Sequence, residues 1–165
     1  IRPLNTEAMN FAIKLSTLLF ISTCSFFFQG VDTSKRVGHF NLDSKHLAID
    51  GYDPVAYFTK GVATEGSKKY SLNYKGVTYY FSSLKNKSLF EGDPIKYEPQ
   101  YGGWCAYAMG DNGEKVSINP KTFKIVDGKL YLFYNKLFTN TLIPWNEDED
   151  NLKGNADDFW KELIR

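Results

Sequence analysis

An Asp-Gly pair places the tightest local restriction on how this chain can fold. Asp127 and Gly128 separate two β-rich runs, residues 123–126 and 129–134. Because this dipeptide readily takes the positive backbone angles of a two-residue turn, the pattern predicts a β-hairpin. The fold must therefore accommodate a short antiparallel ribbon in the C-terminal half of the chain.

A second hairpin, followed by a short helix, is predicted further upstream. Two β-rich runs, residues 70–74 and 77–81, are joined by the Lys-Gly pair at 75–76, which is typical of a hairpin. The serines at 82–83 can cap a helix at residues 84–90 by accepting hydrogen bonds from its free N–H groups.

Two further helix starts complete the pattern. Asp93 and Pro94 begin a brief helical turn that ends near Tyr97. Asn155 is a good N-cap for a C-terminal helix, whose aromatic face we expect to lie on the sheet. That face is formed by Ala156, Phe159, Trp160 and Leu163. The alternation of short strands and helices from Leu47 onward predicts an α+β domain, a small mixed sheet of hairpins with short helices.

The N-terminal residues have the pattern of a secretory signal. Lys14 supplies a positive charge, and residues 15–28 form an almost unbroken apolar run of 14 residues. This run is short for a bilayer-spanning helix, which needs about 20 residues, but it suits the core of a signal peptide. We expect translation to start at Met9. Both an uncleaved anchor and lipid attachment at Cys24 remain open.

The expected organisation has three parts. Residues 1–30 would be upstream residues and signal peptide, residues 31–46 a polar lead or linker, and residues 47–165 the globular domain. A signal segment implies that the domain works in the periplasm or outside the cell.

Charge and cysteine content exclude some classes of protein. Removing Arg2, Lys14 and Glu7 with the first thirty residues leaves 18 basic and 18 acidic side chains. Such a balanced chain has no basic stripe for a phosphate backbone, so nucleic-acid binding is disfavoured. If Cys24 is removed, only Cys105 remains, and the domain depends on packing rather than on a disulfide.

Three motifs carry a family resemblance. They are residues 51–58 (GYDPVAYF), residues 74–97 (beginning YKGVTYYFSS), and residues 100–106 (QYGGWCA). In this order and spacing they resemble the exported branch of the YHS domain family, over about residues 47–110. The hairpin and helix of that branch would extend the resemblance to residue 165.

The resemblance implies the YHS fold, but the residues at three positions of this chain argue against the metal site that some members are expected to carry. Members associated with copper ATPases carry cysteines at three positions where this chain has Ala56, Ser82 and Asn86. Copper and zinc prefer thiolate ligands, and neither serine nor asparagine replaces a thiolate at neutral pH. The resemblance therefore suggests copper or another transition metal as a cofactor, whereas these residues argue against thiolate ligation.

Cys105 is the remaining thiol, and three roles are open to it: a packed core residue, a ligand for metal or haem, or a reactive thiol. Its apolar neighbours Trp104 and Tyr107 favour the first, because a nucleophilic cysteine needs nearby positive charge or a base. His39 and His46 are weak candidates for completing a metal site with Cys105, provided that the polar lead folds back.

Further candidate residues lie in the three motifs. Asp53 precedes Pro54 and more simply fixes a turn than acts as an acid or base. The tentative ligand-binding set comprises Cys105, Tyr52, Asp53, Tyr80, Tyr101 and Trp104. Its aromatic rings either pack in the core or line a pocket for a small planar or apolar ligand.

The leading hypothesis is an exported, non-enzymatic binding module for a small ligand or a metal ion. One alternative is a thiol-dependent enzyme that uses Cys105; another is a structural module that docks a protein partner. Contact with a membrane is expected only through an uncleaved signal or a lipid anchor.

Overall fold

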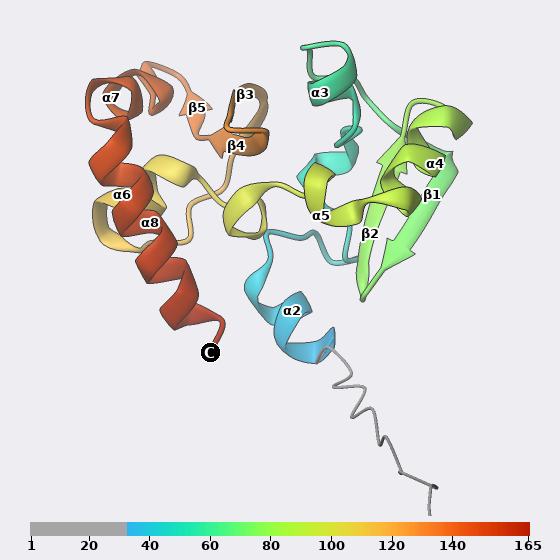
Figure 1. Ribbon diagram of the computed structural model, residues 1–165, viewed down its shortest axis with the longest axis horizontal. Helices are drawn as coiled ribbons and strands as arrows, with labels where there is room; N and C mark the ends of the chain where they lie inside the picture. Colours follow the sequence, from blue (N-terminus) through green and yellow to red (C-terminus); the bar gives the residue numbers. More distant parts are fainter. Residues whose placement is uncertain (1–32) are drawn as a thin grey trace, which may run out of the picture. The chain divides into compact units, whose positions relative to one another are not determined.

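The computed structural model describes residues 33–165, so the predicted signal segment lies outside the described residues. Helices and short antiparallel strand pairs make up the chain, as the predicted α+β class requires (Figure 1). The elements in chain order are α2 (Thr33–His39), η1 (Ile49–Gly51), α3 (Ala56–Thr59), β1 (Ser67–Tyr74), β2 (Val77–Phe81), α4 (Leu84–Gly92), α5 (Pro94–Tyr97), η2 (Gln100–Gly103), α6 (Ala106–Asn112), β3 (Asn119–Val126), β4 (Lys129–Phe133), β5 (Asn135–Lys136), β6 (Thr139–Asn140), α7 (Leu142–Glu147) and α8 (Glu149–Leu163).

Both predicted hairpins are present. β1 pairs antiparallel with β2, and β3 with β4, in each case across a two-residue turn. All four turn residues have positive φ: 49° at Lys75, 85° at Gly76, 50° at Asp127 and 71° at Gly128. Positive φ at both central positions matches the right-handed twist of the flanking strands, which is why these pairs form tight turns.

The hairpins do not join into the single mixed sheet that was expected. Each strand pair within residues 33–165 is its own two-stranded sheet, and β5 with β6 forms a third. In the described part of the chain, parallel pairing is limited to isolated bridges, for example Cys105 with Leu132. The helices α4, α5 and α6 lie in the chain between the two long hairpins.

The predicted caps of the two short helices are confirmed. The Ser83 hydroxyl accepts a hydrogen bond from the Asn86 backbone N–H at the start of α4. The Asp93 carboxylate accepts one from the Lys96 backbone N–H at the start of α5. In each case the side chain satisfies an N–H group that has no partner within the helix.

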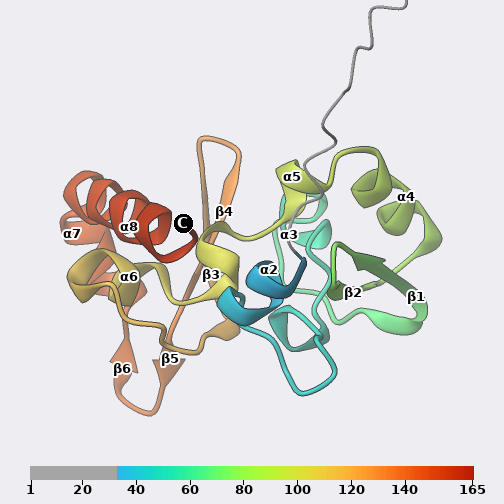
Figure 2. The ribbon, with the colours of Figure 1, turned by 90° about the horizontal axis from the view of Figure 1, so that it is seen from below.

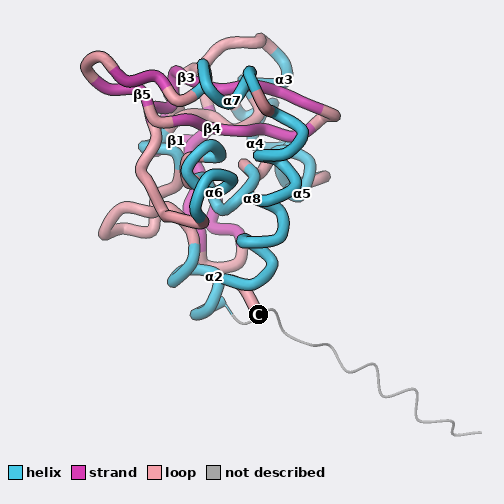
Figure 3. Tube along the Cα trace, turned by 90° about the vertical axis from the view of Figure 1, so that its left-hand side faces the viewer, coloured by secondary structure: helices cyan, strands magenta, loops and turns pink. Residues whose placement is uncertain are grey.

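The C-terminal helix differs from the prediction in its start and in its neighbour. α8 begins at Glu149, so Asn155 lies inside the helix rather than at its cap. α8 runs beside α6, in addition to packing on the second hairpin (Figure 3). A Cβ atom at Gly110 of α6 would collide with the Leu152 carbonyl. The absence of that side chain lets the two helices approach closely, while Phe159 is left 38% exposed.

The core consists of two clusters, and nine of their 19 buried residues are aromatic. The first lies around the β1–β2 hairpin and includes Tyr57, Tyr79, Phe81 and Phe90. The second lies between β4, α6, α7 and α8 and is centred on Trp145. Rings of this size bury about 150–250 Å² each, which explains how a domain without an internal disulfide acquires a core.

The segment predicted as a linker is instead structured from residue 33. α2 carries Arg36, whose guanidinium forms an ion pair with Glu98 and lies 4.1 Å from the centroid of the Phe40 ring. The Asn41 backbone N–H donates to the Gly102 carbonyl at 2.9 Å. The ion pair and the hydrogen bond join residues about sixty positions apart, which explains why local periodicity did not reveal them. Within residues 33–165 no helix combines the length and apolarity that crossing a bilayer requires.

Candidate functional site

Asp53 lies at the centre of a buried polar cluster. Its side chain is fully buried and accepts five hydrogen bonds. Oδ1 accepts from the backbone N–H groups of Val55 at 2.9 Å and Ala56 at 3.3 Å. Oδ2 accepts from the Ser82 backbone N–H at 2.8 Å, the Ser82 hydroxyl at 2.7 Å and the Asn86 side-chain amide at 2.7 Å. The carboxylate thereby joins α3, the end of β2 and α4.

Local sequence explains half of this geometry. An aspartate readily accepts from the N–H groups two and three residues ahead, which fixes a turn and caps the first turn of a helix. This confirms the expectation that Asp53 holds a turn beside Pro54. The other half depends on the chain's return through Ser82 and Asn86, about thirty residues later.

The three positions that bear cysteines in the thiolate-containing relatives meet at this cluster. Ala56, Ser82 and Asn86 each place a donor against the Asp53 carboxylate. A metal ion requires lone pairs directed at it, whereas here N–H and O–H groups converge on one acceptor. Among residues 33–165 no group of three or more His, Cys, Asp or Glu side chains could hold a metal ion. The cluster therefore does not fit a thiolate-type metal centre.

Cys105 is also fully buried, at the start of α6. Its sulfur lies 3.3 Å from the Thr141 hydroxyl and accepts from the Tyr134 backbone N–H at 3.3 Å. Its own backbone N–H donates to the Val116 carbonyl at 2.9 Å. The thiol thus ties α6 to the end of the second hairpin, in a position that no solvent-borne substrate reaches.

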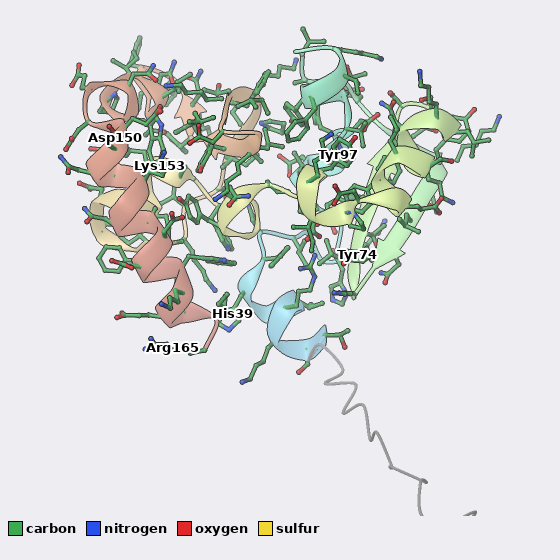
Figure 4. All side chains as sticks on the ribbon, in the orientation of Figure 1. His39, Tyr74, Tyr97, Asp150, Lys153 and Arg165 are labelled. Atoms are coloured by element: carbon green, nitrogen blue, oxygen red, sulfur yellow. The ribbon has the colours of Figure 1, made fainter. Side chains whose placement is uncertain are left out.

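The two histidines lie apart from the cysteine. His39 is half-buried on α2 (Figure 4), with Nδ1 3.4 Å from the Lys115 amine. His46 is exposed, and its backbone carbonyl accepts from the Thr78 N–H at 2.8 Å. The polar lead does fold back, as a metal set would require, but it brings the His39 backbone carbonyl to the Trp104 indole N–H at 2.6 Å. No hydrogen bond joins the His39 ring to Cys105.

The glycines beside Cys105 are contact points for the N-terminal segment. Gly102 has φ 60°, and a Cβ atom there would lie 2.8 Å from the Phe40 ring and 2.9 Å from the Trp160 ring. The close backbone approach that these glycines predict is therefore to side chains of the same chain. Phe40 covers the Gly102 surface, so this turn is not an open ligand site.

The tyrosines divide between core and surface. Tyr57, Tyr79, Tyr101 and Tyr131 are buried, and burial raises the pKa of each hydroxyl, that of Tyr131 to about 12. Nearby carboxylates raise the pKa further, for instance Asp157, which accepts from the Tyr101 hydroxyl at 3.0 Å.

The remaining candidates are half-buried. Tyr52 reaches the Glu65 carboxylate at 3.4 Å. The Tyr80 ring lies over Gly51, and a Cβ atom built at that glycine would be 3.4 Å from it. Tyr52, Asp53 and Tyr80 lie around the first hairpin, whereas Tyr101, Trp104 and Cys105 lie near α6 and the second hairpin. The structure therefore does not unite the predicted ligand-binding set in one pocket.

A surface pocket of about 380 Å³ lies beside Cys105. Its walls are residues 117–120 and residues 134–136. The Tyr134 N–H, which donates to the Cys105 sulfur, belongs to one wall. Ile118, Pro120 and Tyr134 supply apolar surface, and Lys136 is the charged residue in the lining. Sequence reasoning missed this pocket, because its two walls are distant in the chain and meet only at the open end of the second hairpin, where the start of β3 lies beside the end of β4.

A second polar cluster also went unpredicted. Glu98 accepts from the Tyr79 hydroxyl at 2.6 Å and pairs with Arg36 of α2. The Arg36 Nε–H is buried and has no hydrogen-bond partner within residues 33–165. The cluster joins α2 to the first hairpin, and an arginine in an apparent linker is too weak a signal to have revealed it.

Comparison with known proteins gives one match. The model of the YHS domain family matches residues 55–101, which include Ala56, Ser82 and Asn86 but end before Cys105. No curated protein and no solved structure matches the chain.

Proposed function

Because this chain carries a YHS domain over residues 55–101, we propose that it is an exported, non-enzymatic binding module whose ligand binds at the surface beside Cys105. The observation that carries the proposal is the saturated Asp53 carboxylate. Its five hydrogen bonds fill the interior position where thiolate-bearing relatives would hold a metal.

The surface pocket supports the binding half of the proposal. A recess of about 380 Å³ accommodates a small molecule, since ligand pockets are commonly about 300–1,000 Å³. Apolar walls with one lysine suit a ligand that has a planar or apolar body and an anionic group. Cys105 is then a positioning residue, because its sulfur holds the Tyr134 backbone of the pocket wall.

The burial of Cys105 argues against the thiol-dependent enzyme. A reactive thiolate needs access and nearby positive charge or a base. The polar groups at the Cys105 sulfur are a threonine hydroxyl and a backbone N–H, and its exposed fraction is zero.

Chemical-shift mapping of the full chain tests the proposal, with benzoate as an aromatic carboxylate probe. We expect perturbed backbone signals at residues 117–119 and 134–136, weakened in Lys136→Ala. Lys129→Ala is the matched control, because Lys129 is exposed but lies outside the pocket lining. Signals that do not move with benzoate would contradict a site for this class of ligand.

Metal titration tests the second part of the proposal, that the interior position around Asp53 holds no metal ion. With Cys24 replaced by Ser to remove the N-terminal thiol, we expect no copper or zinc binding tighter than about micromolar. A tight complex whose formation perturbs Asp53, Ser82 and Asn86 would restore the metal hypothesis. A tight complex abolished by Cys105→Ser would assign the metal to Cys105 instead.

A further inference from the structure

The β5–β6 hairpin ends in two fully solvated apolar side chains. Lys136 pairs with Thr139, so Leu137 and Phe138 form a two-residue loop. Leu137 is 88% exposed and Phe138 is 104% exposed. Figure 2 shows this hairpin projecting from the body of the domain. Neither side chain contributes to the core.

The loop is built against local backbone preference. Leu137 has φ 55°, in the left-handed region that glycine or asparagine adopts more easily. Neither turn chemistry nor packing therefore accounts for leucine and phenylalanine at these two positions. An exposed apolar pair in an unfavourable turn indicates a function outside the fold.

The stem of the hairpin is held firmly to the domain. The Asn119 side-chain amide donates to the Asn135 carbonyl at 3.1 Å, and the Asn135 amide donates to the Thr122 hydroxyl at 2.9 Å. The Thr141 backbone N–H donates to the Tyr134 carbonyl at 3.0 Å. Leu137 and Phe138 therefore lie at the end of a hairpin whose stem is fixed to the domain by hydrogen bonds.

Lysines outnumber acidic residues in the segment that contains the hairpin, between Glu114 and the acidic run at residues 147–150. Residues 115–146 contain five lysines and one acidic residue, Asp127. Lys153 pairs with this aspartate. Within residues 33–165, Lys121 and Lys136 form no ion pair. Two unpaired positive charges therefore accompany the apolar tip.

We propose that the tip of the β5–β6 hairpin, Leu137 and Phe138, inserts into an anionic lipid surface. Apolar side chains that enter the interface, with lysines that meet anionic headgroups, are the two terms that drive peripheral membrane binding. A protein partner fits less well, because a stable protein interface needs about 800 Å² from each side. A two-residue loop on a narrow ribbon offers far less, whereas insertion into lipid needs no complementary surface.

A fluorescent label at the tip tests the proposal in the full chain. An environment-sensitive fluorophore is attached to Phe138→Cys in a Cys24→Ser background, where the remaining Cys105 is buried. Vesicles contain either phosphatidylcholine alone or equal parts of phosphatidylcholine and phosphatidylserine, with brominated acyl chains as quenchers. Ile95→Cys, at an exposed apolar residue of α5 (78% exposed), is the matched control. Local quenching separates tip insertion from any binding by the N-terminal apolar segment.

We expect quenching of the label at position 138, but not at position 95, on the anionic vesicles. Leu137→Ser should lower the inserted fraction about tenfold, and Lys121→Glu should lower it by at least about fivefold on anionic vesicles. A label at position 138 that stays in water on both vesicle types overturns the proposal. Insertion of the tip into a cleft of a protein partner would then be the alternative. Equal quenching with and without phosphatidylserine would also overturn it, because the lysines would then have no part.

Discussion

Replacing Asp53 by alanine should destabilise this domain more than removing an exposed helix cap such as Asp93. The substitution removes one fully buried acceptor and leaves five donor groups facing each other, at former distances of 2.7–3.3 Å. Three of these donors are backbone N–H groups, which cannot rotate away.

The magnitude follows from two opposing terms. Hydrogen bonds to a charged group contribute about 1.5–3 kcal/mol each, but removal of the carboxylate also removes its desolvation penalty of several kcal/mol. We therefore expect Asp53→Ala to lower the free energy of unfolding by about 3–5 kcal/mol. Asp53→Asn should lower it by about 2 kcal/mol, because Ser82 and Asn86 can reorient around the amide while the Ser82 backbone N–H loses its acceptor.

Urea unfolding, followed by tryptophan fluorescence, measures these differences. Asp93→Ala is the matched control, because Asp93 caps α5 from an exposed position through one side-chain hydrogen bond and should cost about 1 kcal/mol. If Asp53→Ala destabilises no more than Asp93→Ala, the carboxylate does not organise the fold. The interpretation of the Ala56–Ser82–Asn86 position as a filled structural cluster would then fail.

Three further outcomes are expected. Cys105 should react with iodoacetamide only after denaturation, because its exposed fraction is zero; rapid labelling of the folded chain would contradict its structural role. The contribution of Tyr131 to the free energy of unfolding should be fully present below pH 10 and fall as the pH rises toward about 12. The reason is that burial raises the pKa of Tyr131 to about 12, while an unfolded tyrosine ionises near 10. Tyrosinate absorbance that titrates fully near pH 10 in the folded protein would refute this. Gly102→Ala should lower the free energy of unfolding by about 1–3 kcal/mol, because its Cβ atom would collide with Phe40 and Trp160. Gly128→Ala, at φ 71° with no atom within 4 Å, isolates the backbone strain, and an equal loss in both variants would show that packing of the N-terminal segment contributes nothing.

The filled cluster changes what the match to the YHS domain model means for this chain. The family match spans the three positions at which the resemblance places cysteines, yet the groups there, the Ala56 backbone N–H and the side chains of Ser82 and Asn86, donate to the Asp53 carboxylate. The same arrangement of α3, β2 and α4 can therefore be held together by hydrogen bonds. The proposed ligand-binding activity then lies outside the matched segment, near Cys105.

The sequence by itself determined the local elements. Both hairpins followed from turn pairs whose residues tolerate positive φ, and two helix starts followed from Ser83 and Asp93. Each of these features depends on hydrogen bonds between residues a few positions apart, so a short stretch of sequence is enough to predict it. The motif residues likewise identified the family, which the match over residues 55–101 confirms.

Only the tertiary structure decided which distant residues meet. It brought Ser82 and Asn86 to Asp53, packed Phe40 on Gly102, and left Leu137 and Phe138 exposed to solvent. It also set α8 against α6 as well as against the second hairpin, where the sequence pattern predicted the sheet alone. A periodic pattern shows that a face is apolar but not what covers it, because the covering surface is chosen by packing among segments far apart in the chain.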